Sequence, residues 1–202
     1  MDEGGLELTF LEYREAFLRA LAARDAGRVV TMIQPELRNR SFVEFLRLSP
    51  QEIAGREEAW VWRELERTIS HGGAFTTSEG AVHGRREFCA PYAYVRYPRA
   101  SPLLSEMGEA YPWVVIGRNV AVRRSPSIKA AVIARVSYEL LPVDDRDARD
   151  ESGGPIVWQG VYLPNGRYGF IADDLLWGDR DYHACFANFD GQWLLTKFER
   201  GL

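Results

Sequence analysis

Residues 161–171 read Val161-Tyr162-Leu163-Pro164-Asn165-Gly166-Arg167-Tyr168-Gly169-Phe170-Ile171. Two short apolar runs, 158–163 and 168–171, flank the central Asn-Gly pair. Such a pair between two apolar runs is typical of a tight β-hairpin, because Asn and Gly both tolerate positive φ angles. The segment therefore predicts two adjacent antiparallel strands, and the rest of this half of the chain is interpreted around them.

The surrounding residues, 111–178, contain only short extended runs separated by glycine and proline. An acidic stretch over 144–154 interrupts them and is predicted to be a loop. So many short strands must close or stack to cover their edges, which favours a small β-barrel. The further predicted strands are 114–116, 120–123, 132–136 and 140–143.

A short motif precedes these strands. Val122 and Arg123 form a Val-Arg pair, followed by a turn of a small residue, proline and serine at 125–127. This motif resembles the opening of bacterial Src-homology-3 (SH3) domains, and 161–171, with Gly-Phe before the last turn, resembles their end. The resemblance covers 113–177 and implies an SH3-like barrel with a shallow peptide-binding groove. The acidic stretch departs from the family, which has a tighter connection there.

Helical periodicity dominates the first 73 residues instead. Residues 6–24 predict an amphipathic helix, Asp25 a capped second helix, and 41–48 a third. Ser49-Pro50-Gln51-Glu52 is a typical helix start for a fourth helix that ends at 71–73. The runs that follow are predicted as strands over 74–76 and 86–97, and the prolines of 98–112 indicate a domain boundary.

The last residues predict a second hairpin, in which Asp190-Gly191 turns the chain between 182–186 and 193–198. A free two-stranded hairpin is marginal in water, so this one is expected to pack back on the N-terminal region. Its pattern resembles the terminal strands of small α+β cone-shaped domains. The expected fold class is α+β: a helical and α+β domain over 1–110, completed by 179–202, and an SH3-like β-barrel over 111–178.

The composition of the chain excludes some classes of binding partner. The chain has 202 residues and a net charge of −4, with basic residues interspersed among acidic ones. A nucleic acid or an anionic membrane surface needs clustered Lys and Arg, so neither is an expected partner. No apolar run approaches the roughly 20 residues of a membrane helix, and residues 1–5 lack signal-peptide features. The chain is therefore expected to be cytoplasmic, or periplasmic or extracellular if a signal peptide has been removed.

The inventory of catalytic residues is small. The three histidines have no metal-ligand spacing, and no metal or other cofactor is expected. Cys89 and Cys185 both lie in apolar runs, which favours two small buried side chains, with a disulfide as the alternative. Bacterial SH3 domains often accompany cell-wall cysteine peptidases, but neither cysteine has the helix N-terminus that activates a thiolate, so a Cys dyad with His183 is disfavoured.

Aromatic residues are the strongest functional indication. Several lie on the predicted barrel, and because strand residues alternate faces, some must point outward. Trp158 is expected in the core. The candidate ligand-binding residues are Trp113, Tyr138, Tyr162, Tyr168 and Arg123.

The preferred function is a non-catalytic binding module of a bacterial cell-envelope protein that recognises a peptide or a peptidoglycan fragment. One alternative is a structural protein that binds a partner protein. Another is a pocket enzyme in the N-terminal part; its candidate polar residues are Tyr92, Tyr94, Glu64 and His71.

Overall fold

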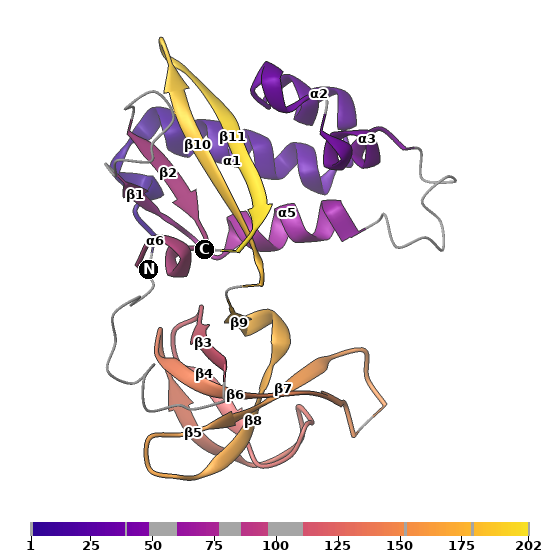
Figure 1. The fold of residues 1–202 in the computed structure, drawn as a ribbon, viewed down its shortest axis with the longest axis vertical. Coiled ribbons are helices and arrows are strands. Elements are labelled where there is room, and N and C mark those ends of the chain that lie inside the picture. The colour runs from indigo at the N-terminus through magenta and orange to yellow at the C-terminus, as the bar shows by residue number, and fades with distance from the viewer. Residues whose placement is uncertain are drawn as a thin grey trace. The chain divides into compact units, whose positions relative to one another are not determined.

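The computed structural model describes residues 2–38, 40–48, 60–76, 86–96, 111–151, 153–178 and 180–201. The chain divides into two compact units, Met1–Arg96 with Tyr182–Leu202, and Tyr97–Asp181. Over the described residues the fold is mixed α+β, with five α-helices and two antiparallel sheets (Figure 1). Within the same residues, no helix combines the length and apolarity needed to cross a membrane.

The helices all belong to the first unit. They are α1 (Leu8–Ala22), α2 (Ala26–Thr31), α3 (Ser41–Arg47), α5 (Trp60–Ser70) and α6 (Tyr92–Arg96), with 3-10 turns at Gly4–Leu6 and Pro35–Leu37. The predicted cap of α2 is confirmed, since the Asp25 carboxylate accepts a hydrogen bond of 2.9 Å from the Arg28 backbone N–H. The helix start predicted at Ser49-Pro50 lies outside the described residues, as does most of the predicted boundary over 98–112.

Four strands form the sheet of the first unit in the order β1-β2-β10-β11. They are β1 (Ala74–Thr76), β2 (Glu87–Ala90), β10 (Tyr182–Phe189) and β11 (Gln192–Arg200). The C-terminal hairpin is confirmed: Asp190 and Gly191 have φ angles of 53° and 94° and form a two-residue turn between paired Phe189 and Gln192. Its strand β10 pairs with β2, so the hairpin packs on the N-terminal region as expected.

The strand predicted over 86–97 is wrong beyond Ala90. Pro91 follows β2, and because proline has no backbone N–H it ends the strand pairing there. The chain then turns into α6 rather than continuing to Tyr97.

One face of this sheet packs against the helices to form the core of the first unit (Figure 1). Phe88 and Ala90 of β2 belong to this core, as do Ala184 and Phe186 of β10. Their neighbours along the two strands, Glu87, Cys89 and Cys185, must point to the opposite face, because side chains alternate along a strand. They are nevertheless almost fully buried.

The second unit contains one sheet of seven strands in the order β5-β4-β8-β7-β6-β3-β9. The strands are β3 (Tyr111–Val115), β4 (Val120–Arg123), β5 (Val132–Val136), β6 (Leu140–Arg149), β7 (Val157–Tyr162), β8 (Tyr168–Ala172) and β9 (Leu176–Trp177), with a 3-10 turn at Asp173–Leu175. One face buries a cluster of ten apolar residues, among them Val122, Val161 and Ile171. No pairing between the end strands β5 and β9 closes the sheet over the described residues, so a closed barrel is not found.

Two details of this sheet differ from expectation. The acidic stretch 144–154 is not one loop, because β6 continues through it to Arg149, with a register shift between Asp144 and Asp147. The hairpin around Asn165-Gly166 is confirmed, but its last strand pair is Tyr162 with Tyr168. Pro164 lacks the N–H that a two-residue loop requires at that position, so the loop is longer and only Gly166 has a positive φ, of 76°.

Candidate functional site

A row of side chains crosses the outer face of the second sheet. Strand register places Arg123 on β4 beside Phe170 on β8, Phe170 beside Gly160 on β7, and Gly160 beside Asp144 on β6. Paired residues point to the same side of a sheet, so these four share one face. This face is opposite to the one that carries Val161 and Ile171 and buries the core.

Three aromatic rings gather on this face. Tyr162 and Tyr168 are cross-strand partners whose ring centroids lie 5.0 Å apart, and the Phe170 ring lies 5.3 Å from that of Tyr168. The exposed fractions are 43% for Tyr162 and 40% for Tyr168, while Phe170 is half-buried. We call Tyr162, Tyr168 and Phe170, with Arg123 and Asp144 at either end, the aromatic face.

Glycine at position 160 lets the tyrosine lie flat on the sheet. A Cβ built at Gly160 would collide with the ring and hydroxyl of Tyr168. Across this gap the Tyr168 hydroxyl donates a hydrogen bond of 3.3 Å to Asp144 Oδ2. The ring is therefore held in one orientation, which lowers the entropy lost when a ligand packs on it.

The basic end of the face is also oriented. Arg123 is half-buried, and its Nη1 donates a hydrogen bond of 2.8 Å to the Ala130 carbonyl oxygen. A guanidinium has five N–H donors, so the remaining ones can bind a carboxylate in the two-point geometry typical of arginine.

Three of the five candidate residues, Arg123, Tyr162 and Tyr168, thus share the aromatic face. Trp113 on β3 does not share this face: it pairs with the core residue Leu141 of β6 and packs, partly buried, against the core. Tyr138 lies in the turn after β5, with a φ angle of 56°. Trp158 is buried as expected, and its indole N–H donates to Asp150.

Sequence reasoning missed Phe170, Gly160 and Asp144. Phe170 could have been found, since it follows Tyr168 by two residues and so shares its face. Gly160 could have been found in the same way, since it precedes Tyr162 by two residues, whereas Asp144 could not, because its place depends on the register of β6 against β7.

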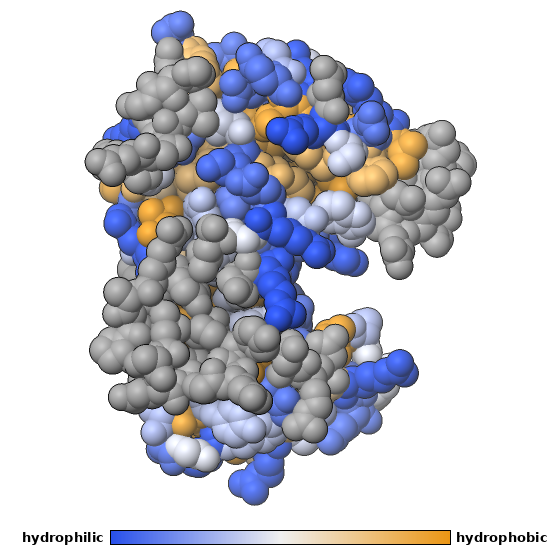
Figure 2. All heavy atoms as spheres, viewed as in Figure 1, coloured by the Kyte–Doolittle hydropathy of each residue, from blue (hydrophilic) through white to orange (hydrophobic). Residues whose placement is uncertain are grey.

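The first unit contains a cavity of about 420 Å³ between α3 and the C-terminal hairpin. Figure 2 shows hydrophobic residues reaching the surface of this unit between β10–β11 and the helices. The cavity is lined by Arg40, Phe42, Trp60, Tyr182, Lys197 and Phe198, among others. Trp60 and Phe198 each stack on Tyr182, with ring centroids 5.0 Å and 4.7 Å from that of Tyr182, so the Tyr182 ring is already packed by its neighbours.

The polar residues considered for a pocket enzyme do not line this cavity. Glu64 lies on α5 and forms ion pairs with Arg63 and Arg67, and His71 Nδ1 lies 2.6 Å from the Arg67 carbonyl oxygen. Tyr94 stacks on His183.

His183 is a neutral, buried ring. It is 2% exposed and lies parallel to the Tyr94 ring, with a centroid separation of 3.8 Å. The pKa of His183 is lowered to about 4, chiefly because the ring is buried and secondly because of the nearby charge of Lys197, while a hydrogen bond with the backbone of Gly201 opposes the shift. At neutral pH the His183 ring is therefore uncharged, and its stacking on Tyr94 packs α6 against β10.

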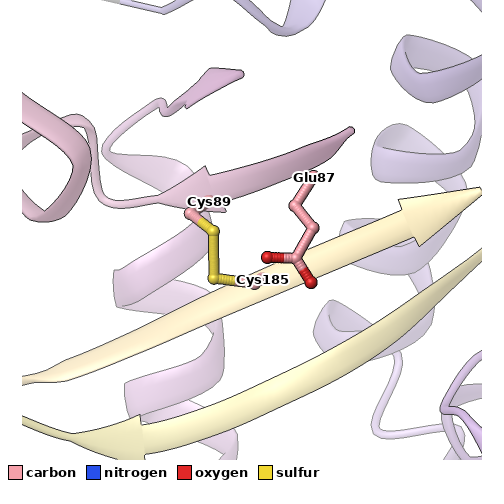
Figure 3. Close-up of side chains that lie close together, drawn as sticks. All are labelled: Glu87, Cys89 and Cys185. Atoms are coloured by element: carbon pink, nitrogen blue, oxygen red, sulfur yellow. A yellow bond between two sulfur atoms is a disulfide. The ribbon is translucent and has the colours of Figure 1, made fainter. Parts of the chain in front are cut away.

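Cys89 and Cys185 form a disulfide, and the favoured interpretation of two independent buried thiols is wrong (Figure 3). The two residues are directly opposite each other on β2 and β10, with Cα atoms 4.1 Å apart. So short a separation is typical of a non-hydrogen-bonded antiparallel pair, which brings side chains together. With both sulfurs bonded, neither can act as the nucleophile of a Cys–His dyad.

No protein-family model, curated protein or solved structure matches this chain. The function is therefore argued from the geometry of its side chains.

Proposed function

We propose that the second unit is a non-catalytic binding module and that an extended peptide binds across its aromatic face. The observation that carries this proposal is the adjacent pair Tyr162 and Tyr168, each about two-fifths exposed and held against a third ring. Aromatic side chains are enriched at the centres of binding sites, because they bury much apolar area with few rotatable bonds. Isolated exposed apolar residues are ordinary on proteins, whereas a cluster of this kind indicates a contact surface.

An SH3-like barrel is the fold we propose for this unit. Among its described residues there is no α-helix, yet ten apolar residues are buried on one face of its sheet. A sheet without helices can bury such a face only by curling or folding over on itself. The Val122-Arg123 motif lies on β4, and Arg123 contributes to the aromatic face, as expected for a barrel whose groove starts there.

The charges at the two ends of the face suggest the chemistry of the ligand. Arg123 on β4 and Asp144 on β6 are separated by strands β8 and β7, so three strand spacings of about 4.8 Å place them roughly 14 Å apart. An extended peptide of four to five residues spans that distance at about 3.3 Å per residue. A peptide with a free carboxylate near Arg123 fits best, and peptidoglycan stem peptides have this chemistry.

The disulfide supports an exported location for such a module. Disulfides persist in oxidising compartments, including the bacterial periplasm and the cell surface, and are rare in the cytosol. A wall peptide is accessible from these compartments.

We expect soluble peptidoglycan fragments to shift the backbone amide NMR signals of Tyr162, Tyr168 and Phe170 when titrated into the full chain. The double variant Tyr162→Ala/Tyr168→Ala should bind at least about tenfold more weakly, because each hot-spot aromatic contributes on the order of 1 to 2 kcal/mol. Arg123→Gln should weaken fragments with free carboxylates more than their amidated forms.

The matched control is Val157→Ala. Val157 is 44% exposed on the same strand as Tyr162, but it lies five positions before Tyr162, an odd offset, so its side chain is on the opposite face. It should leave the affinity unchanged. Absence of any shift with fragments, together with a co-purified protein whose binding depends on Tyr162 and Tyr168, would replace the wall peptide by a partner protein as the ligand. A double variant that binds like the wild type would refute the aromatic face as the site.

A further inference from the structure

Aromatic rings form the apolar wall of the cavity of about 420 Å³ in the first unit. Phe42 on α3 and Phe198 on β11 belong to the buried core, and Trp60 and Tyr182 pack half-buried against it. The ring centroids of Phe42 and Phe198 lie 5.4 Å apart. Protein interiors contain few voids larger than a water molecule, whereas sites for small ligands enclose about 300 to 1,000 Å³. The volume and the lining are therefore those of a site for a small molecule with an apolar body.

Arg40, which directly precedes α3, supplies a positive charge at this cavity. Lys197 and Glu199 also line it, but they alternate with Phe198 along β11, so their side chains leave the sheet on the face opposite to that of Phe198. On that face a Glu199 carboxylate oxygen lies 3.6 Å from His183 Nε2. The Arg40 side chain is exposed, and its guanidinium forms no hydrogen bond or ion pair with the described residues. An uncompensated cation thus adjoins the aromatic wall.

The outer edge of β11 adds main-chain polar groups to the cavity. β11 is an end strand of its sheet, and its outer side meets another part of the described chain at Leu195. There the Leu195 N–H donates a hydrogen bond of 3.0 Å to the Met32 carbonyl oxygen, and the Leu195 carbonyl oxygen accepts one of 2.9 Å from the Gln34 N–H. The chain then enters the 3-10 turn at Pro35–Leu37, and residues 196–199 border the cavity. The N–H and C=O groups of an edge strand are available to a bound molecule.

We propose that this cavity binds a small carboxylic acid with a flat apolar body, which packs on Phe42 and Trp60 while its carboxylate pairs with Arg40. A guanidinium binds a carboxylate through two parallel N–H···O hydrogen bonds, so the charge selects an acid over a neutral molecule of the same shape. The apolar body replaces water on the exposed parts of the aromatic wall, which favours binding. The proposal concerns the first unit and does not depend on the peptide-binding function of the second.

The probe is 3-phenylpropionate, titrated into the full chain and followed by the NMR signals of the Trp60 indole N–H and the Phe198 backbone N–H. Both signals should shift with a Kd of about 1 mM or tighter, as expected for a ligand with so few atoms. The uncharged isostere 3-phenylpropionamide should bind about fivefold more weakly, the upper range for a partly solvated ion pair. Arg40→Gln should weaken binding of the acid by the same factor and leave the affinity for the amide unchanged.

Arg47→Gln is the matched control, because Arg47 is an exposed arginine at the end of α3 that does not line the cavity; both affinities should stay as in the wild type. The proposal is overturned if neither signal moves at concentrations of the acid well above that Kd, or if acid and amide bind equally. It is also overturned if Arg40→Gln binds the acid like the wild type or loses both ligands. Shifts confined to Tyr162 and Tyr168 would place the acid on the aromatic face instead, which overturns this proposal and leaves the proposed function of the second unit intact.

Discussion

Reduction of the Cys89–Cys185 disulfide is expected to lower the free energy of unfolding of the first unit by about 3 to 4.7 kcal/mol. The two cysteines are 96 residues apart, and a crosslink that closes a loop of about this length removes that much conformational freedom from the unfolded chain. The lower figure applies if the second unit stays folded inside the loop. Its terminal strands β3 and β9 pair with each other, so a folded second unit shortens the effective loop.

Urea denaturation with and without a phosphine, in the presence of a metal chelator, measures this difference. The control is the double variant Cys89→Ser/Cys185→Ser, which should match the reduced wild type and show no response to the reductant. A difference below about 1 kcal/mol would mean that the unfolded chain is hardly restricted by the crosslink.

Phe10→Ala is expected to lower the free energy of unfolding of the first unit by about 3 to 5 kcal/mol, the range for deleting a fully buried phenylalanine. Phe10 on α1 is 0% exposed, and its ring contacts an aromatic side chain on every strand of the first sheet. The centroid distances are 4.1 Å to Phe88, 4.9 Å to Trp193, 5.7 Å to Phe186 and 5.9 Å to Phe75. Removing the ring leaves a cavity that four strands and a helix cannot all close.

Leu8→Ala is the control, because Leu8 begins the same helix but is 67% exposed. It should change the free energy of unfolding by no more than about 0.5 kcal/mol. Intrinsic tryptophan fluorescence follows the transition, since Trp193 contacts Phe10 directly. Equal effects of the two substitutions would show that α1 is not anchored through this ring.

The two hairpins could be predicted from the sequence, because the residue types at their turns favour positive φ angles. Asp190 and Gly191 turn the chain with the positive φ angles that their types favour, Gly166 does so in the longer loop after β7, and Asp25 caps α2. The prediction was wrong for 144–154, because charged residues are compatible both with a loop and with an exposed strand. The charges of 144–154 indicated a loop, but one side of an exposed strand tolerates charges, and β6 needs its full length to pair with β7.

The candidate sites depend on register, which a single sequence does not reveal. Tyr162 and Tyr168 could be selected because they flank a predicted turn, but Asp144 joins them only through the register of β6 against β7. Cys89 and Cys185 could not be assigned as a pair, since their contact requires β10 to lie beside β2 in one particular alignment. A shift of β10 by one residue would place the Cys185 sulfur on the helix-facing side, away from Cys89.

The strand order β1-β2-β10-β11 has a consequence for synthesis on the ribosome. The two strands that complete the first sheet are the last to be translated, after the whole second unit has emerged. Until then α1 and β2 have no partner for Phe10 and Phe88 on the C-terminal side, and the β2 edge is open to other chains. The second unit is contiguous and can fold during elongation, whereas the first unit cannot complete its sheet until β10 and β11 have emerged, and its incomplete form exposes apolar surface in the meantime.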